Sequence, residues 1–306
     1  MAPLSRNIED YPEGIIIPID KPYRWTSADV IRKVKYTAIR HFGKKNLKVG
    51  HAGTLDPLAT GVLLVCIGKA TKLAEELQSH DKEYVAGITF GATTPSYDLE
   101  KEIDRFFPHE HITASAVAEA LPSFIGEQDQ IAPLFSAKSV DGVRAYELAR
   151  KLHQQGKTPD EAAAELIRVS RINITELELM SYVGSGDRSR RHATPGQGVD
   201  ECHRHGPGVF GSDAGSDAAQ ESNASSRINV TDNSELGLPH ASVRMACSKG
   251  TYVRAFARDL GEALGSGAHL DSLQRSRSGI FRVENALTVD QAVELLLGGA
   301  QPPVKQ

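Results

Sequence analysis

The spacing of hydrophobic residues changes from strand-like to helical and back along the chain. The apolar run Ile15–Ile19 is typical of a short buried strand. The next segment has the apolar period of an amphipathic helix, and it opens with Thr26 as N-cap and Asp29 three residues later, the spacing of a capping box. Its basic residues then face outward. The expected buried positions of this helix are Val30, Ile31, Val34 and Ala38.

A strand pattern returns in "EYVAGITFGA", where alternate residues from Tyr84 to Phe90 share one face. By this pattern alone, Tyr84 is better interpreted as a core tyrosine than as a site residue. Strands and helices alternate without a regular βαβ period, which favours an α+β fold with a mixed sheet. Further elements are predicted as helices at 114–124 and 143–156, strands at 168–183 and 240–248, a helix from about Thr251 and a short final helix.

Between residues 184 and 239 the hydrophobic pattern disappears. This stretch is rich in Gly, Ser, Asp and Asn, so it cannot bury enough apolar surface to offset chain entropy. We predict a disordered insertion that joins two strands of a hairpin and separates residues 1–183 from residues 240–306 of one domain. Within it, "ECHRHG" suggests a metal site, but no second ligand pair has a useful spacing, and a solvated loop is favoured. The ligands of that site would be Cys202, His203 and His205.

The formal net charge of -4 gives no overall sign of nucleic-acid binding. The local distribution differs, because residues 31–50 contain many basic side chains and no acid. Such a surface could bind a polyanion, or it could be a solvated helix face, and charge alone does not decide between them. The basic residues are Arg32, Lys33, Lys35, Arg40, Lys44, Lys45 and Lys48.

Cysteine usage and the N-terminal sequence predict a cytoplasmic protein without a membrane span. Cys66, Cys202 and Cys247 lie far apart with no CxxC spacing, which argues against a disulfide framework and suits a reducing compartment. The N-terminal apolar run ends at Pro18 and is too short for a signal peptide or a membrane helix.

Candidate chemistry concentrates in "KVGHAGTLDPLATGVLLVCIGKATK", residues 48–72. Its Gly68-Lys69 pair suggests a phosphate loop, but Leu63 stands where a Walker A loop requires glycine and Ala70 where it requires a hydroxyl. The segment before Gly68 is better interpreted as a buried strand. A nucleotide-hydrolase function is therefore disfavoured.

Asp56 is the notable acid of this stretch. It lies between Gly53 and Gly61, which permit tight turns, and directly before Pro57, which restricts the backbone. An isolated Asp before Pro is usually a turn former or a cap. No second acid is close in sequence to complete a glycosidase pair. Spacing alone leaves both interpretations of Asp56 open.

The motif "GHAGTLDPLATGVL" resembles the catalytic motif of the TruB family of transfer-RNA pseudouridine synthases. Further segments are similar to that family in the same order, and together they cover most of the chain outside the insertion. They are "DKP…TS" at Asp20–Ser27, "KEY" at Lys82–Tyr84, "QIAPLFSA" at Gln130–Ala137, "GVRAYELAR" at Gly142–Arg150, "CSKGTYVR" at Cys247–Arg254 and "LQRSRSG" at Leu273–Gly279.

The resemblance implies a pseudouridine synthase fold, with a mixed and mostly antiparallel sheet flanked by helices and loops. It implies isomerisation of uridine to pseudouridine at position 55, in the T loop of transfer RNA, without a metal or organic cofactor. The target base must be flipped out of the loop. The expected partner is the T arm of transfer RNA, and no obligate protein partner is predicted.

Six positions match site residues of the family. Asp56 would be the nucleophile, Arg254 would keep its carboxylate charged and oriented, and Tyr84 would stack on the base and help proton transfer. His51 would hold the flipped-out loop conformation. Tyr252 would lie beside the uracil and Leu273 would close its apolar wall.

Other aspects of the resemblance are less direct. Lys21 is expected to be structural or to face a phosphate, while Arg275, Arg277 and Arg282 are expected to contact phosphates together with the basic helix. Too few residues follow Arg282 for the C-terminal PUA domain of many relatives. Two alternatives stay open: an RNA chaperone that uses the same surface without chemistry, and an enzyme whose target is another RNA with a T-loop-like hairpin.

Overall fold

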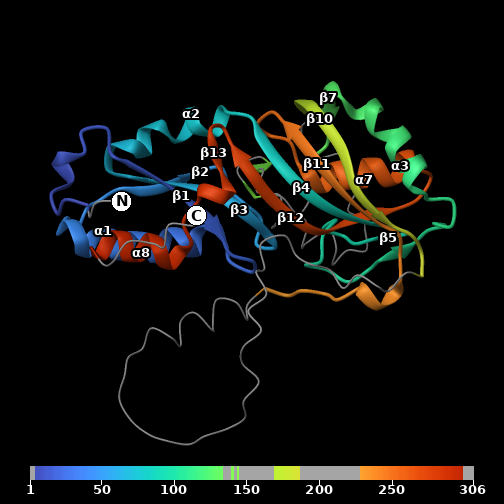
Figure 1. Ribbon diagram of the computed structural model, residues 1–306, viewed down its shortest axis with the longest axis horizontal. Helices are drawn as coiled ribbons and strands as arrows, with labels where there is room; N and C mark the ends of the chain where they lie inside the picture. Colours follow the sequence, from blue (N-terminus) through green and yellow to red (C-terminus); the bar gives the residue numbers. More distant parts are fainter. Residues whose placement is uncertain (1–3, 134–138, 141–142, 145–168, 187–227, 299–306) are drawn as a thin grey trace, which may run out of the picture.

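The computed structural model describes residues 4–133, 139–140, 143–144, 169–186 and 228–298. A nine-stranded mixed sheet runs through this part of the chain (Figure 1). Its strands are β1 (Ile15–Lys21), β2 (Val49–Ala52), β3 (Ala59–Ile67), β4 (Lys82–Phe90), β7 (Gly126–Gln130), β10 (Ser170–Val183), β11 (His240–Cys247), β12 (Ala268–Ser278) and β13 (Phe281–Arg282). Two small separate ladders are β5 (Ala92–Thr93) with β6 (Arg105–Phe106) and β8 (Ser139–Val140) with β9 (Val143–Arg144).

The hydrogen-bonded order of the large sheet is β1-β3-β12-β4-β11-β10-β7, with β2 paired to β3 and β13 paired to β12. β12 pairs with β3 in parallel, and the other pairs are antiparallel. This confirms the predicted α+β class and the mostly antiparallel mixed sheet. Because β12 lies between β3 and β4, it brings the strand that follows Asp56 close to the strand that carries Tyr84.

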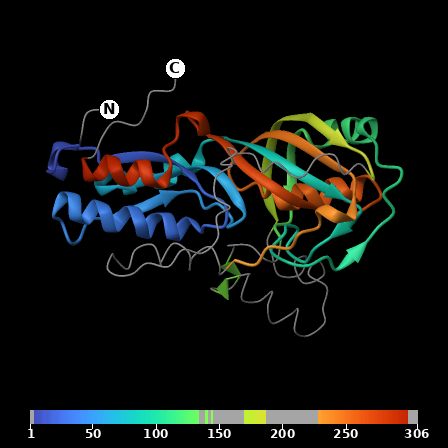
Figure 2. The ribbon, with the colours of Figure 1, turned by 60° about the horizontal axis from the view of Figure 1, so that its bottom comes forward.

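Helices cover the two ends of the sheet differently (Figures 1 and 2). α1 and α8 pack against each other at one end, whereas α7 packs on β12 and β4 and α3 packs on β10 at the other end. The helices are α1 (Ser27–Phe42), α2 (Ala74–Ser79), α3 (Ala114–Ala120), α7 (Val253–Ala263) and α8 (Val289–Leu297). The 3₁₀ turns are η1 (Ile8–Asp10), η2 (Gly68–Leu73), η3 (Leu121–Phe124), η4 (Ser234–Leu236) and η5 (Val283–Asn285).

The predicted start of α1 is confirmed in detail. Thr26 and Asp29 form a reciprocal capping box, in which the Thr26 side chain accepts from the Asp29 amide and the Asp29 side chain accepts from the Thr26 amide. Val30, Val34 and Ala38 are fully buried, as their spacing predicted, whereas Ile31 is only half-buried. This cap fixes where the helix begins, and the residue that follows it contacts the loop of Asp56.

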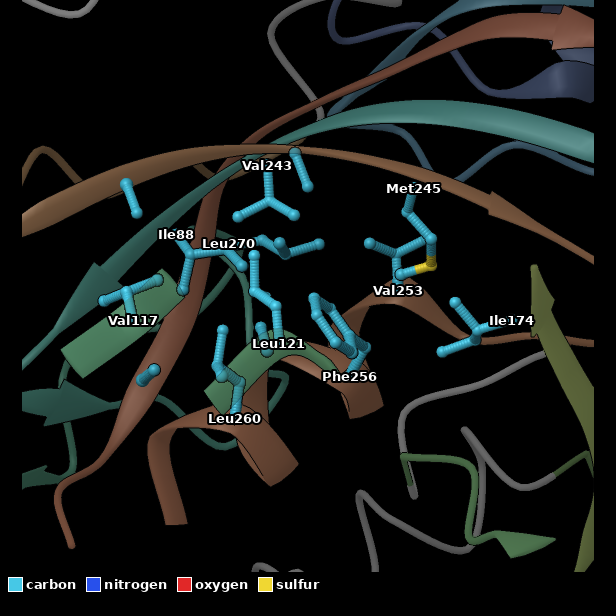
Figure 3. Packing of buried hydrophobic residues seen from close by; sticks show 14 of the residues in the cluster. Ile88, Val117, Leu121, Ile174, Val243, Met245, Val253, Phe256, Leu260 and Leu270 are labelled. Carbon is cyan, nitrogen blue, oxygen red and sulfur yellow. The ribbon is translucent and has the colours of Figure 1, made fainter. Parts of the chain in front are cut away.

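A hydrophobic core lies between the sheet and α7 (Figure 3). Strand residues of β4, β11 and β12 point toward α7 and toward the shorter helical turns α3 and η3. Phe256 of α7 is 1% exposed and packs edge-to-face on Phe124. Truncation of a phenylalanine at such a position costs about 3–5 kcal/mol of stability. The core therefore holds α7, which carries Arg254, firmly against the sheet.

The two strands predicted on either side of the insertion do pair. β10 and β11 are antiparallel neighbours, and Val183 lies opposite His240. Residues 187–227, with the metal ligands suggested by "ECHRHG", lie outside the described residues.

The prediction of disorder is wrong for residues 228–239. The Thr231 amide donates to the Leu99 carbonyl at 2.8 Å, and Nη2 of Arg24 donates to the Ile228 carbonyl at 2.9 Å. This segment is ordered by backbone hydrogen bonds rather than by burial of large apolar side chains, so composition could not reveal it.

Two helix predictions need correction. The segment 114–124 is an α-helix only to Ala120, and it continues as the 3₁₀ turn η3, where Pro122 has no amide to donate. Val143–Arg144 forms the strand β9 rather than the start of a helix, and residues 145–156 lie outside the described residues.

Candidate active site

The loop between β2 and β3 carries Asp56, and its backbone is anchored on both sides. The Ser27 hydroxyl accepts from the Leu55 amide at 3.0 Å and contacts the Leu55 carbonyl at 3.1 Å. The Pro57 carbonyl accepts from the Arg24 amide at 3.0 Å. These contacts hold the residues directly before and after the acid. Asp56 itself keeps a side chain that is 41% exposed, as a group that reacts with a ligand requires.

Lys21 also anchors the loop that carries Asp56. Its ammonium is completely buried and donates to the carbonyls of Pro22 at 3.0 Å, Trp25 at 2.6 Å and Pro57 at 3.2 Å. Three acceptors match the three protons of an ammonium. Burial lowers the pKa of Lys21 to about 7. Of the two roles expected for Lys21, the structural one is found, because a side chain with no exposed surface cannot face a phosphate.

Arg254 reaches Asp56 from the first turn of α7. Its Nε lies 2.9 Å from Oδ2 of Asp56, and its Nη1 donates to the Ser96 carbonyl at 2.9 Å and lies 3.5 Å from Oδ2 of Asp98. The arginine side chain is 6% exposed. Burial opposes its charge, but Asp56, Asp98 and Glu100 outweigh this effect and raise the pKa of Arg254. The pair predicted from sequence is therefore formed, with Asp98 as a second carboxylate on the same guanidinium.

Sequence reasoning missed Asp98. Its side chain is 8% exposed and accepts from the Ser96 hydroxyl at 2.6 Å and from the Glu100 amide at 3.0 Å. Burial raises the pKa of Asp98, and the charge of Arg254 opposes that change. The signal available was a Ser-x-Asp-x-Glu turn, which is too common to indicate a site.

Asp56 opens onto a pocket of about 340 Å³. Five of the six predicted site residues line it: Asp56, Tyr84, Tyr252, Arg254 and Leu273. They come from the loop before β3, from β4, from the start of α7 and from β12. The pocket walls thus combine one charged pair with aromatic and aliphatic surface, as expected for a site that holds a planar base.

His51 is the predicted site residue that does not line this pocket. It lies on β2 opposite Val65, and its ring is half-buried. Its Nδ1 is buried and has no hydrogen-bond partner in the described part of the chain. Burial lowers the pKa of His51, and the charge of Arg275 lowers it further.

Tyr84 serves both the core and the pocket. On β4 it lies between Met245 of β11 and Arg275 of β12, and it packs against two hydrophobic clusters, one beneath α7 and one beneath α1 and α8. Burial raises the pKa of the Tyr84 phenol, and the charge of Arg275, directly opposite on β12, opposes that change. The core role suggested by its pattern and the site role implied by the resemblance are therefore compatible.

Arg275 contradicts the expectation of a phosphate contact. Its side chain is 1% exposed and donates to backbone carbonyls inside the protein. Arg277 and Arg282 differ, because Arg277 is half-buried and Arg282 is exposed. Lys82, which sequence reasoning did not single out, also lines the pocket, and burial lowers its pKa to about 8.

A separate basic groove of about 510 Å³ lies beside β2. Lys35 of α1 and Lys45 and Lys48 of the following loop line it, together with Gly50 and Thr71. Within the described residues, none of these three lysines forms an ion pair. Gly50 borders this groove and Gly53 borders the pocket, so β2 leads from one to the other over about 10 Å.

No described helix is long and apolar enough to cross a membrane. Among the same residues, no group of three or more His, Cys, Asp or Glu side chains is placed to hold a metal ion.

Comparison with known proteins gives consistent matches along the chain. The family model for "TruB family pseudouridylate synthase (N terminal domain)" matches residues 40–187, and that for "tRNA pseudouridylate synthase B C-terminal domain" matches residues 254–298. Curated proteins called tRNA pseudouridine synthase B are similar over almost their full length. The one from Phocaeicola vulgatus is 44% identical over 94% of this chain and 95% of its own. One from Bacteroides fragilis is 43% identical over 91% of this chain and 92% of its own.

Solved structures share the fold at lower identity. A chain of a Cbf5-Nop10-Gar1 complex has a TM-score of 0.54 at 23% identity and is matched by 96% of this chain. A chain of an H/ACA RNP bound to a substrate RNA has a TM-score of 0.52 at 20% identity. This chain spans 58% and 55% of those two chains, so this likeness concerns the fold alone. The near full-length similarity to the curated relatives shows that the chain belongs to the TruB family of pseudouridine synthases.

Proposed function

We propose that this protein isomerises uridine to pseudouridine at position 55, in the T loop of transfer RNA. The observation that carries the proposal is the contact of 2.9 Å between Asp56 and Arg254 at a pocket that Tyr84 also lines, in a chain of this family. A transfer-RNA substrate places the enzyme in the cytoplasm. We propose no obligate protein partner.

Asp56 is the proposed nucleophile. Arg254 holds Oδ2 at 2.9 Å and so orients a carboxylate whose side chain is still 41% exposed to the pocket, as a nucleophile requires. The reaction breaks the N1–C1′ bond of uridine and forms a C5–C1′ bond. C5 loses its proton and N1, freed from the sugar, gains one, so the product is an isomer. Asp56 is regenerated at the end of the cycle.

The pocket suits a base that has left its stack. Tyr84 and Tyr252 offer aromatic surface, and Leu273 offers an aliphatic wall. A uridine inside a folded loop cannot reach Asp56 unless it is flipped out, so we propose base flipping as the entry step. His51 of β2 lies two residues before Gly53, which lines the pocket. His51 is proposed to hold the RNA loop in its flipped-out conformation.

The basic groove is the proposed contact for the RNA backbone that flanks the target. Lys35, Lys45 and Lys48 present charges that no described acid neutralises. Phosphates are the natural partners of such lysines, and binding should weaken as salt rises. The position of the groove along β2, beside the pocket, places it within reach of nucleotides next to the flipped one.

We also propose that residues 1–183 and 240–306 form one catalytic domain. β4 from the first part pairs with β11 and β12 from the second part in the same sheet. Asp56 and Tyr84 belong to the first part and Arg254 to the second, so the site is assembled only when both parts fold together.

The test is incubation of the purified protein with an unmodified transfer-RNA transcript, followed by mapping of pseudouridine at single-nucleotide resolution. Wild type should produce one new pseudouridine in the T loop, and Asp56→Asn should produce none while it still binds the transcript. Equal modification by both proteins, or modification by neither, contradicts the proposal. If Asp56→Asn refolds RNA as well as wild type does, the protein also has chaperone activity. That activity needs the RNA-binding surface and not the Asp56 carboxylate.

A further inference from the structure

Arg275 is the largest of the fully buried side chains in the described part of the chain. It lies on β12 opposite Gly61 of β3 on one side and Tyr84 of β4 on the other. A buried guanidinium is strongly unfavourable unless its donors are paired. Its partners therefore show what this side chain does.

All the identified partners belong to the catalytic region. Nε donates to the Val62 carbonyl at 2.7 Å, and Nη2 donates to the Gly53 carbonyl at 3.0 Å. Arg275 also lies directly opposite Tyr84 on the neighbouring strand, and both side chains line the pocket. The charge of Arg275 therefore acts on the phenol of Tyr84.

Gly53 begins the loop that carries Asp56, and Val62 lies within β3, the strand that follows this loop. One planar group thus joins the start of the loop to β3, at the position directly opposite Tyr84. Gly61 makes this close approach feasible, because a Cβ there would lie 2.3 Å from the Arg275 carbonyl oxygen.

We propose that Arg275 is a positioning residue for the isomerisation, which fixes the start of the Asp56 loop to β3 and places its charge beside the Tyr84 phenol. The geometry supports both parts, because Arg275 donates to the carbonyls of Gly53 and Val62 and lies directly opposite Tyr84 in the sheet. Both side chains line the pocket. The inference rests on the proposed function for its kinetic consequences, and on the contacts alone for the state of Tyr84.

Electrostatics support this role. Burial raises the pKa of the Tyr84 phenol, and the charge of Arg275 opposes that change. Loss of the guanidinium should therefore make the phenol less acidic.

The first test measures this acidity directly. 3-Fluorotyrosine replaces Tyr84, and its fluorine chemical shift is followed against pH. The otherwise wild-type protein is compared with Arg275→Gln. We expect a higher phenol pKa in Arg275→Gln. Arg244→Gln is the matched control, because Arg244 lies on the other neighbour of β4 and binds Glu83, Glu176 and Glu178 instead of Tyr84. An unchanged phenol pKa in Arg275→Gln overturns the proposed effect of Arg275 on Tyr84.

The second test is a double-mutant cycle on single-turnover rates at saturating transcript. Arg275→Gln should lower the rate about 10- to 100-fold, as expected for loss of charged hydrogen bonds, with an unchanged Kd for RNA. In a Tyr84→Phe background the same change should cause a clearly smaller loss. If Arg275→Gln lowers the rate by the same factor in the wild-type and Tyr84→Phe backgrounds, Arg275 has only a structural role. A weaker Kd with an unchanged rate would identify a phosphate contact.

Arg275→Lys keeps the test decisive if Arg275→Gln does not fold. Lysine retains the charge, but its ammonium cannot reproduce the planar fork that donates to the carbonyls of Gly53 and Val62. We expect a folded protein, by thermal unfolding, with a reduced rate, whereas the full wild-type rate overturns the proposal. If wild type makes no pseudouridine, the proposed function fails, but the fluorine titration still decides the effect of Arg275 on Tyr84.

Discussion

Nε of Arg254 lies 2.9 Å from Oδ2 of Asp56, although the arginine begins helix α7 and the aspartate belongs to the loop before β3. The arginine is almost completely enclosed, while the aspartate is partly open to solvent. This asymmetry fits a pair in which one partner is fixed and the other reacts. Asp98 completes the arrangement, because it balances the charge of Arg254 from the protein side.

Arg254→Gln should therefore damage both stability and activity. It leaves Asp98 buried without its counter-ion, and breaking a buried pair in this way costs about 3–5 kcal/mol of unfolding free energy. The rate of pseudouridine formation should fall by about 100-fold or more, because Asp56 loses its orienting charge. Urea unfolding and a single-turnover assay measure the two effects.

Arg171→Gln is the control for the Arg254 variant. Arg171 is an exposed arginine that bridges Glu127 and Asp129 at the edge of the sheet. Exposed pairs contribute little, so stability and activity should stay near wild type. Comparable damage from both variants would contradict a special role for Arg254.

Lys21→Met should destabilise the fold by about 2–3 kcal/mol, because three buried carbonyls lose their donor. One of them belongs to Pro57, so the Asp56 loop should also become more mobile. Denaturant unfolding gives the first effect, and hydrogen exchange of the amides at 55–59 gives the second. Lys44→Met, which removes only an exposed pair with Glu9, should leave both measurements unchanged. Unaltered exchange in Lys21→Met would separate Lys21 from the loop.

Glu100 should give the protein a measurable pH dependence. Burial, followed by the charge of Asp98, raises the pKa of Glu100 from 4.5 to about 7. The folded state then binds a proton that the unfolded state has released between these values, so stability falls as pH rises from about 4.5 to 7. Glu100→Gln cannot titrate and should lose this part of the pH dependence. Parallel stability curves for the two proteins, measured by denaturant unfolding from pH 4 to 8, would contradict the assignment.

The basic groove predicts a change in salt dependence. Replacement of Lys35, Lys45 and Lys48 by Gln should weaken RNA binding and reduce the slope of log K against log salt by about 2 to 3. The single-turnover rate at saturating RNA should change little, because these lysines lie outside the pocket. Lys44→Gln is the matched control from the same loop, since its charge already pairs with Glu9. An unchanged slope in the triple variant would remove the groove from the RNA-binding surface.

Much of the local structure was predictable. The capping box of Thr26 and Asp29, most of the buried face of α1 and the position of β4 appear as expected, although β4 is buried on both faces from Ala86 to Phe90 rather than on alternate residues. Each depends on residues within a few positions of one another, where period and capping chemistry act directly. Asp56, Tyr84 and Arg254 could also be selected, because they stand in motifs that resemble those of a known family.

Other features escaped prediction because their partners come from elsewhere in the chain. Arg275 looks like a surface arginine in "LQRSRSG", yet its donors meet carbonyls on β3 and on the Asp56 loop. Asp98 gains its role only through Arg254. Residues 228–239 look too polar to be ordered, but their backbone groups pair with the loop at 99–101.

The sequence by itself determined most of the elements, the position of the proposed nucleophile and the family. Only the tertiary structure decided which charges are buried together, and hence that Arg254 faces two carboxylates and Arg275 binds the loop instead of RNA. The physical reason is one of range. Helix and strand preferences are set by near neighbours, whereas the free energy of a charged group depends on the solvent and partners that the complete fold places around it.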